Sequence, residues 1–298
     1  MPTKSVVVSG GNGLLGRATV EKLSANFTVT ALVRQFPQNP CGGVEYIELD
    51  LSAEWDASVL PKQCDVVIHL AQSNNYKDFP DSALEVYNVN LSSTLKLLDY
   101  GRRAKISRFI LASTGGLYPQ NRLPLNEQSE LFALDKLTHY LGTKLSAEIF
   151  ARNYLPYFNV DLLRIFFMYG PGQKMNMLVP RLITSILDGK PILLPGGNGI
   201  ALNPIYVSDV ASVIQSRMAS RGSTVVNVSG QEVVTIKELA NRIGTYLNKD
   251  PVFEIDEPQL DLVSEFELCL EMLSGQTVSL ADGLASTIDW IHELRRNG

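Results

Sequence analysis

Tyr140 and Lys144 are the side chains whose types and spacing point most directly to chemistry. They stand four residues apart in a stretch with helical patterning, so they are expected to share one helix face. A phenol has an unperturbed pKa of about 10, and a neighbouring ammonium or the positive ring of an oxidised nicotinamide lowers it. Tyr140 could then take a proton from a hydroxyl group, or return it, while hydride moves. Because Tyr-x-x-x-Lys is common by accident, the surrounding elements must support this interpretation.

A pair of hydroxyl side chains stands upstream, at the end of a predicted strand over residues 107–112. The sequence Leu-Ala-Ser-Thr-Gly-Gly-Leu-Tyr closes this strand and places Ser113 and Thr114 at its carboxyl edge. Ligands of open parallel sheets bind at that edge. Thr114 is therefore expected close to a bound ligand, and Ser113 is expected to lie behind the residues that contact it.

Three glycines lie between the first predicted strand and the first predicted helix. Gly10, Gly13 and Gly16 stand in Ser-Gly-Gly-Asn-Gly-Leu-Leu-Gly. Such glycines permit a tight turn, a close approach of backbone to a pyrophosphate, and close packing of helix on sheet. The helix N-terminus at Leu14 and Leu15 offers unpaired N–H groups and a positive dipole end to phosphates. This context predicts a dinucleotide-binding turn rather than a purely structural one.

The end of the second predicted strand discriminates between the two pyridine nucleotides. An acidic side chain there bonds a ribose 2′-hydroxyl, whereas an arginine accommodates a 2′-phosphate. The chain has Val33 and then Arg34, which favours NADP as the cofactor. In the alternative interpretation Arg34 is a solvated loop residue and the cofactor is NAD. Asp50, after the third predicted strand, is expected either at the adenine end of the cofactor or as the cap of the next turn.

Strands and helices alternate along the chain, which predicts a parallel sheet with helices on both faces. The predicted fold is α/β, a Rossmann-type doubly wound parallel sheet with a smaller C-terminal α/β substrate lobe. Residues 1–170 form the predicted dinucleotide-binding domain. Residues 171–298 are predicted to be mainly a substrate-binding lobe that closes over a cleft, with a segment near 205–228 that returns to the first domain. The predicted strands span residues 5–8, 27–33, 44–49, 65–70, 107–112 and 160–165, with short ones near Val225 and Val252, and the predicted helices span 14–25, 81–104, 134–154, 177–187, 205–219, 236–247 and 280–295.

The bulk composition argues against several other classes of protein. The 298 residues carry a formal charge of −5 and no basic tract of the kind that nucleic-acid binding needs. No apolar run is long enough to cross a bilayer, and the start, Met-Pro-Thr-Lys, resembles neither a signal nor a transit peptide. Three scattered cysteines and three dispersed histidines predict free thiols in a reducing compartment and no metal site. The expectation is a cytoplasmic protein without metal, nucleic-acid or membrane partners.

The order of these segments along the chain is that of one family. The chain resembles the extended short-chain dehydrogenase/reductases, also called the NAD-dependent epimerase/dehydratase family. The resemblance implies a homodimer in which the helices over residues 81–104 and 134–154 pair as a four-helix bundle. The matching segments are residues 10–16, 50–51, 69–71, 88–90, 113–118, 140–144, 164–172, 205–211 and 279–284.

The resemblance also implies a role for individual residues. Thr114 would hydrogen-bond the reacting oxygen, Tyr140 would be the acid/base, and Lys144 would tune Tyr140 and hold the nicotinamide ribose. Asn90 would support the nearby helix or a water. Motif context and resemblance together give the expected cofactor-binding residues Gly10, Gly13, Leu14, Leu15, Gly16, Arg34, Asp50, Leu51, Leu70, Ala71, Asn90, Tyr140 and Lys144.

Gly115 and Gly116 bear on which reaction of the family to expect. Dehydratases of the family carry an acid pair just after the position of Thr114, and related decarboxylases usually keep a glutamate. Glycine cannot move a proton, so both reactions are disfavoured, and two small residues leave room for a keto-sugar to turn over. We therefore expect a nucleotide-sugar epimerase that works through a transient keto-sugar. An NADPH-dependent ketoreductase of a nucleotide sugar or other polar carbonyl and a non-catalytic NAD(P)-binding sensor are the alternatives.

Two departures from the family pattern concern the substrate. Phe167 stands where members often have an asparagine, and Leu202-Asn203-Pro204 stands where many have an arginine that clamps a diphosphate. Lys174, Asn176 and Arg181 are candidates to replace that arginine, and a substrate without a nucleotide stays open. The expected substrate-binding residues are Gly115, Gly116, Tyr118, Phe167, Asn176 and Arg181.

Overall fold

A computed structural model describes residues 4–297 of the chain. The first three residues, on which the expectation about a leader peptide mainly falls, lie outside the described residues, as does Gly298. The described residues form two compact units, and the predicted division near residue 170 remains a prediction. Unit 1 comprises the chain up to Leu117 with Leu131–Ile165 and Ala211–Val226, and unit 2 comprises Tyr118–Glu130, Phe166–Val210 and the chain from Asn227 onward.

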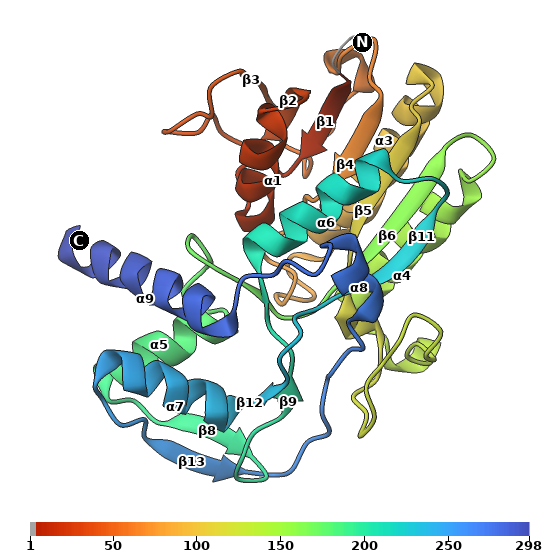
Figure 1. Cartoon of the computed structure of the whole chain (residues 1–298). Helices are drawn as coiled ribbons and strands as arrows, with labels where there is room; N and C mark the ends of the chain where they lie inside the picture. Colours follow the sequence, from red (N-terminus) through yellow and green to blue (C-terminus); the bar gives the residue numbers. More distant parts are fainter. Residues whose placement is uncertain (1–3, 298) are drawn as a thin grey trace. The chain divides into compact units, whose positions relative to one another are not determined.

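Unit 1 is built on a seven-stranded sheet in the order β11-β6-β5-β4-β1-β2-β3 (Figure 1). Strands β1 to β6 run parallel to one another. The central strands are apolar because both of their faces are covered, and residues 6–8 and 66–68 are at most 1% exposed. The strands span β1 Ser5–Ser9, β2 Thr28–Val33, β3 Val44–Glu48, β4 Val66–His69, β5 Arg108–Thr114, β6 Asn159–Ile165 and β11 Thr224–Val228.

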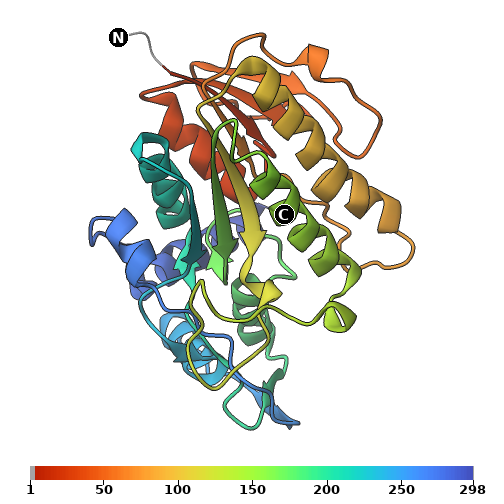
Figure 2. The same ribbon diagram turned by 90° about the vertical axis from the view of Figure 1, so that its right-hand side faces the viewer.

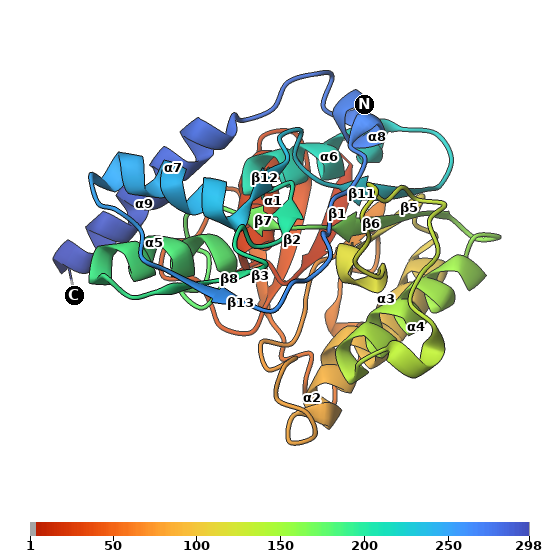
Figure 3. The ribbon, with the colours of Figure 1, turned by 90° about the horizontal axis from the view of Figure 1, so that it is seen from below.

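Helices cover both faces of this sheet. Helix α1 and the part of α6 from Ala211 onward lie on one face, and α3 and α4 lie side by side on the other (Figures 2 and 3). This arrangement is the doubly wound pattern of a Rossmann-type fold, so the predicted fold class is confirmed. The helices span α1 Leu14–Ser24, α3 Ser93–Ala104, α4 His139–Asn153 and α6 Val207–Ala219.

The helices expected from residues 134 and 205 begin later than the sequence patterning predicted. The helix expected from residue 134 begins at His139, because the Thr138 hydroxyl accepts a hydrogen bond from the Leu141 N–H at 3.3 Å and caps it there. Before this cap, residues 134–136 form a separate 3₁₀ turn. The helix expected from residue 205 begins at Val207, since residues 205–206 pair as a short strand with residues 168–169.

The predicted helix over residues 81–104 is interrupted by a π-helical turn. The chain forms α2 over Ala83–Tyr87, the π turn over Asn88–Ser92, and then α3. The Ser93 hydroxyl donates to the Val89 carbonyl and the Thr94 hydroxyl donates to the Asn90 carbonyl. Such turns are rare and frequently occur at functional sites. Here the turn contains Asn90, whose side chain is buried in unit 1.

Unit 2 has a hydrophobic core of its own, in which α5 packs against α7 and α9 (Figure 3). A capping box between Thr235 and Glu238 starts α7. Within residues 4–297, no helix is both long and apolar enough to cross a lipid bilayer. The elements of unit 2 are α5 Leu178–Asp188, α7 Ile236–Leu247, α8 Glu267–Met272 and α9 Leu280–Asn297, with the strand pairs β8 Ile192–Pro195 and β13 Phe253–Asp256, β7 Met168–Tyr169 and β10 Ile205–Tyr206, and β9 Ala201–Leu202 and β12 Val234–Thr235.

Candidate active site

The candidate site lies at the carboxyl edge of the sheet in unit 1. Strands β1 and β4 are neighbours in the centre of the sheet, and the chain leaves them toward opposite sides. Ligands of doubly wound sheets bind at such a switch point, outside the carboxyl ends of the strands. The glycine-rich turn follows β1 at this edge, and Thr114 ends β5 there.

The turn after β1 is shaped so that only glycine fits at two positions. Gly10 has a φ of +73°, and a Cβ there would lie 2.8 Å from the Ala71 nitrogen. A Cβ on Gly16 would overlap the Gly10 carbonyl oxygen. The Gly13 N–H donates to that same oxygen at 2.8 Å. The backbone of the turn, the start of α1 and the segment after β4 are thus held in close contact.

The N-terminus of α1 can accept an anion. Gly13 is the N-cap and supplies no capping side chain, and no acidic residue stands in the first turn. The free N–H groups and the dipole of such a helix favour a phosphate group. Leu14 is half-buried and Leu15 is buried, so they contribute backbone N–H groups rather than exposed side chains. The turn therefore fits the pyrophosphate of a dinucleotide.

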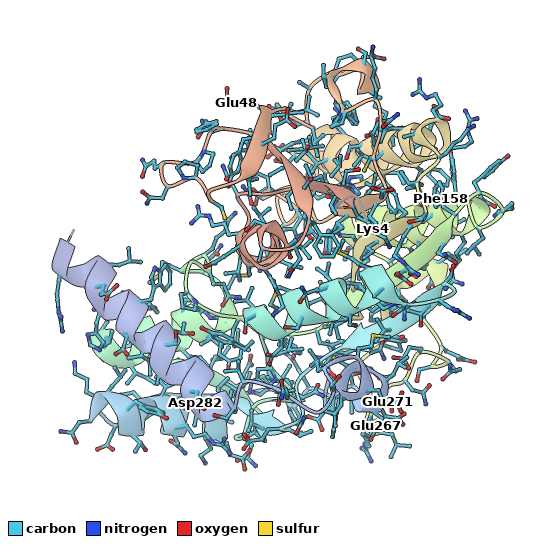
Figure 4. The ribbon with its side chains drawn as sticks, turned by 45° about the horizontal axis from the view of Figure 1, so that its top comes forward. Lys4, Glu48, Phe158, Glu267, Glu271 and Asp282 are labelled. Atoms are coloured by element: carbon cyan, nitrogen blue, oxygen red, sulfur yellow. The ribbon has the colours of Figure 1, made fainter. Side chains whose placement is uncertain are left out.

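Three charged side chains stand near the ends of β2 and β3. Arg34, the residue predicted to favour NADP, is exposed. The Asp50 carboxylate accepts hydrogen bonds from Ser52, and these bonds, with a smaller effect of the Arg34 charge, lower the pKa of Asp50. Asp50 thus caps the following turn. Glu48, labelled in Figure 4, ends β3 and accepts the Phe36 N–H at 2.6 Å.

Tyr140 is hydrogen-bonded on both sides of its hydroxyl group. The Thr114 hydroxyl bonds to it, and the Tyr140 hydroxyl donates to the Gln72 carboxamide oxygen at 3.0 Å. Burial raises the pKa of Tyr140 to about 12, against the lowering effect of the Thr114 bond and with a further rise from Tyr76. The protein's own groups therefore keep this phenol protonated at neutral pH.

Lys144 is buried one turn further along α4, where it meets the sheet. Its ammonium group donates to the Ala112 carbonyl at 3.0 Å. Burial lowers the pKa of Lys144 to about 8, and the charge of Glu148 opposes this effect. Glu148 in turn accepts the Ser113 hydroxyl at 2.5 Å and binds Arg164 through both carboxylate oxygens, at 3.0 and 2.8 Å. The lysine thus belongs to a buried network that joins α4 to β5 and β6.

The segment after β4 approaches the same place. The Ser9 hydroxyl and the His69 Nδ1 lie 2.5 Å apart, and the Ala71 N–H donates to Ser9 at 3.4 Å. Burial, helped by the charge of Lys144, lowers the pKa of His69 to about 3, so this histidine is neutral. Leu70 and Ala71, predicted to contact the cofactor, follow His69 directly and lie next to the Gly10 turn.

Asn90 connects this segment to the helix that carries Tyr140. Its carboxamide oxygen accepts the Ser73 N–H at 3.1 Å, and its amide nitrogen donates to the Thr143 hydroxyl at 3.2 Å. The Thr143 hydroxyl donates to the Tyr140 carbonyl at 2.7 Å. Asn90 therefore supports the nearby helix, one of the two roles expected for it.

The expected substrate residues divide between the two units. Gly115 and Gly116 directly follow Thr114 in unit 1, and the Gly116 N–H donates to the Thr114 hydroxyl at 3.0 Å. The other four lie in unit 2. Tyr118, which was expected to bind substrate, is 1% exposed, stacks on Phe166 and donates to Asn227, so it packs in the interior of unit 2. Phe167 packs against the core of unit 2, whereas Asn176 and Arg181 are exposed.

Comparison with known proteins places this site in a family. A sequence model described as the NAD dependent epimerase/dehydratase family matches residues 6–229. The chain belongs to this family. It is therefore an NAD(P)-dependent enzyme of the extended short-chain dehydrogenase/reductase type, as the sequence resemblance predicted.

Individual members of the epimerase/dehydratase family are similar over most of the chain. The UDP-glucuronate 4-epimerase of Thermodesulfobacterium geofontis is 24% identical over 235 residues, which cover 76% of this chain and 72% of that protein. The dTDP-glucose 4,6-dehydratase of Streptomyces griseus is 28% identical over 241 residues, covering 78% of this chain and 73% of that protein. The structure of MoeE5 in complex with UDP-glucuronic acid and NAD has a TM-score of 0.83 at 25% identity and covers 97% of this chain and 99% of its own.

Four residues of the site were not predicted from the sequence. Glu148 stands four residues after Lys144, so helical spacing already placed it on the same face as Tyr140. His69 lay within a matching segment, but its burial and its bond to Ser9 depend on strand pairing. No sequence pattern pointed to Gln72 or Glu48. Gln72 contacts Tyr140, which is distant in the sequence, and Glu48 bonds to the segment that follows the neighbouring strand β2.

Lys144 should make the stability of the protein depend on pH. Its pKa is about 8 in the folded chain against an ordinary value of 10.5, so the unfolded chain binds more protons between these pH values. The free energy of unfolding should therefore rise with pH across this window, and this contribution is lost as the pH falls through 8. Lys144→Met removes this titrating group. The free energy of unfolding of wild type should therefore rise relative to that of the variant by up to about 1.4 kcal/mol per pH unit within this window. Urea unfolding at several pH values measures the difference.

The control for this measurement is Lys136→Met, at a side chain that is 68% exposed. Its stability should follow that of wild type at every pH. Parallel curves for wild type and Lys144→Met would contradict the burial of a titrating lysine.

Proposed function

We propose that this member of the epimerase/dehydratase family is an NAD-dependent epimerase of a nucleotide sugar. The observation that carries the proposal is the hydrogen bond between Thr114 and Tyr140, followed in the chain by Gly115 and Gly116. This arrangement provides a phenol for proton transfer, and the two residues after Thr114 have no side chain able to move a second proton. The glycine turn at the start of α1 provides the place for the dinucleotide.

Proton transfer is the task assigned to Tyr140. Its oxygen takes the proton of a substrate hydroxyl as the carbon is oxidised to a ketone, and returns it when the other face is reduced. The Thr114 hydrogen bond favours the phenolate in this exchange. By resemblance, Lys144 holds the cofactor's ribose next to the phenol. When bound, oxidised NAD supplies the hydride acceptor and a positively charged ring. Because the sugar ends at the oxidation state at which it began, the reaction would need no net oxidant.

The class of substrate is inferred from similar proteins. Two positions at which this chain departs from the family pattern bear on it. Both the 4-epimerase and the MoeE5 complex are described with UDP-glucuronate, which supports a UDP-linked hexose or hexuronate. A dehydratase is also similar, but Gly115 and Gly116 offer no acid pair for dehydration. Phe167 and the stretch 202–204 lack the asparagine and arginine of many members. We assign their part in diphosphate binding to Asn176 and Arg181, which are exposed in unit 2.

Tyr140→Phe should remove turnover while leaving cofactor binding intact. The variant keeps the ring but loses the group that exchanges the proton, so the rate should fall by about a hundredfold or more. Conversion of UDP-glucuronate, and of other UDP-hexoses, to the 4-epimer can be followed by proton NMR. Calorimetry measures NAD affinity of the same samples.

Tyr157→Phe, at a side chain that is 62% exposed, is the matched control and should keep full activity. A Tyr140→Phe variant with the wild-type rate would show that the phenol is not the acid/base. Stoichiometric consumption of NADPH with a keto substrate, without epimer formation, would favour the ketoreductase instead.

We assign NAD rather than NADP as the cofactor on the balance of charge near β2. Arg34 alone favours a 2′-phosphate, but its charge acts on Asp50, and the Glu48 carboxylate ends the strand paired with β2. The negative charges of the Asp50 and Glu48 carboxylates disfavour binding of the 2′-phosphate that distinguishes NADP from NAD. MoeE5 is described in complex with NAD.

Glu48→Gln should therefore raise the affinity for NADP by about fivefold at low salt, with little change for NAD. The amide oxygen of glutamine can still accept the Phe36 N–H, so the turn is expected to keep its shape. Calorimetric titration with both nucleotides measures the ratio, and Glu45→Gln on the same strand serves as the control. Wild-type protein that already prefers NADP would overturn the assignment and restore the interpretation of Arg34 given above.

We also propose a homodimer through the outer surfaces of α2, α3 and α4. Apolar side chains are exposed there: Leu84 by 79%, Tyr87 by 46%, Leu95 by 43% and Ile149 by 51%. These side chains are carried by helices that contact one another, since α4 packs against both α2 and α3 (Figure 2). Exposed apolar clusters of this kind are typical of protein interfaces.

Ile149→Glu should therefore convert the dimer to a monomer of 32.8 kDa without loss of thermal stability of the subunit. Light scattering coupled to gel filtration measures the mass. The control is Leu123→Glu, at an equally apolar side chain that is 73% exposed in unit 2, which should leave the dimer intact. Wild-type protein that elutes as a monomer at all concentrations would contradict the proposal.

A further inference from the structure

We propose that Gln72 is a further residue of the acid/base site, whose carboxamide binds the Tyr140 oxygen in both the protonated and the deprotonated state of the phenol. The proposal rests on the function proposed for Tyr140 and extends it. Gln72 is the third residue after β4, and it stands outside the residues that the sequence resemblance assigned to the site.

The direction of the hydrogen bonds identifies Gln72 as the acceptor of the phenol proton. The Gly116 N–H donates to the Thr114 oxygen at 3.0 Å, which leaves the Thr114 proton for its bond to Tyr140. The Tyr140 hydroxyl then donates its single proton to the Gln72 carboxamide oxygen at 3.0 Å. Gln72 therefore accepts the hydrogen bond of the phenol proton when no substrate oxygen is present.

Gln72 is held at this place by the residues that follow it. The Ser73 N–H donates to Asn90, and the Ser73 hydroxyl donates to Glu85 at 2.7 Å. The Asn75 amide donates to the second oxygen of the Glu85 carboxylate at 2.8 Å. These bonds fix the backbone of the segment against α2 and the π turn, so the exposed Gln72 side chain reaches Tyr140 from a fixed point of the chain.

An aromatic contact adds to this arrangement. The ring of Tyr76 packs against the ring of Tyr140 with 4.8 Å between centroids, and the Lys77 ammonium lies 5.7 Å from the centroid of Tyr76. Tyr76 thus limits how far the phenol can turn away from Gln72. The segment 72–77 acts as one unit that keeps the Tyr140 hydroxyl aimed at the carboxamide.

The carboxamide suits both states of the phenol, because it carries an acceptor oxygen and two N–H donors on one rotatable group. Its oxygen accepts the proton of the neutral phenol. After a half-turn of the amide, an N–H donates to the phenolate, and a hydrogen bond to a charged oxygen is stronger than one between neutral groups. A carboxylate at this position could only accept and would repel the phenolate.

Two substitutions separate these properties. Gln72→Leu keeps the size but removes both functions, and Gln72→Glu keeps an acceptor while adding a like charge. The phenolate of NAD-loaded protein is followed by near-ultraviolet difference absorbance against Tyr140→Phe, between about pH 6 and about pH 10. The apparent pKa should rise by about 1 in Gln72→Leu, and by more in Gln72→Glu. The exposed Gln63, before β4, provides the control Gln63→Leu, which should titrate like wild type.

Turnover provides a second readout of the same effect. At neutral pH the rate of Gln72→Leu should fall about tenfold, and it should recover toward the wild-type rate as the pH rises, with NAD affinity unchanged. A merely structural role would lower the rate at every pH.

Variants that titrate like wild type, or a wild-type phenol that does not ionise below about pH 10, would overturn the assignment of Gln72. Absence of epimerisation in wild type would instead count against the proposed function, because the absorbance titration needs only NAD and the phenol.

Discussion

The site depends on the interactions of the buried Glu148 carboxylate. It binds Ser113 on β5 and Arg164 on β6, and its charge acts on Lys144 one turn back along α4. Arg164 and Glu148 are at most 4% exposed, and buried charges are tolerated only when paired and hydrogen-bonded. Tyr140, Lys144 and Glu148 follow at intervals of four, so anchoring the last of them fixes the helix face that carries the other two. The salt bridge between Glu148 and Arg164 therefore helps to hold the Tyr140 face of α4 against the sheet.

The protein on its own does not activate the phenol. Burial holds the pKa of Tyr140 well above the neutral range, and the Thr114 bond only reduces that effect. Lys144 directs its ammonium group to the Ala112 carbonyl. In the proposed reaction the missing stabilisation comes from a further positive charge, which an oxidised nicotinamide provides. The acid/base would then become effective when the hydride acceptor is present.

The fold could be predicted because its signals are local. Buried parallel strands form continuous apolar runs, and the turn at Gly10 and Gly16 needs a residue without a Cβ. The start of α4 was predicted wrongly because residues 134–136 have helical character, whereas the Thr138 cap decides where the helix begins. Gln72 could not have been predicted, since its contact with Tyr140 exists only after β4 and α4 have packed. The sequence expectation of NADP, with NAD as the alternative, was based on Arg34 and Asp50 and did not include Glu48, which ends the adjacent strand.

The π turn explains how two such distant segments are aligned. A π turn leaves carbonyl groups poorly bonded, which is costly in a buried helix. Here Ser93 and Thr94 donate their hydroxyls to the carbonyls of Val89 and Asn90, so the local sequence stabilises the irregular turn. The Asn90 side chain is then free to bond Ser73 on one side and Thr143 on the other. A regular helix would rotate this amide away from one of its two partners. The irregularity in the helix therefore couples the position of Gln72 to that of Tyr140.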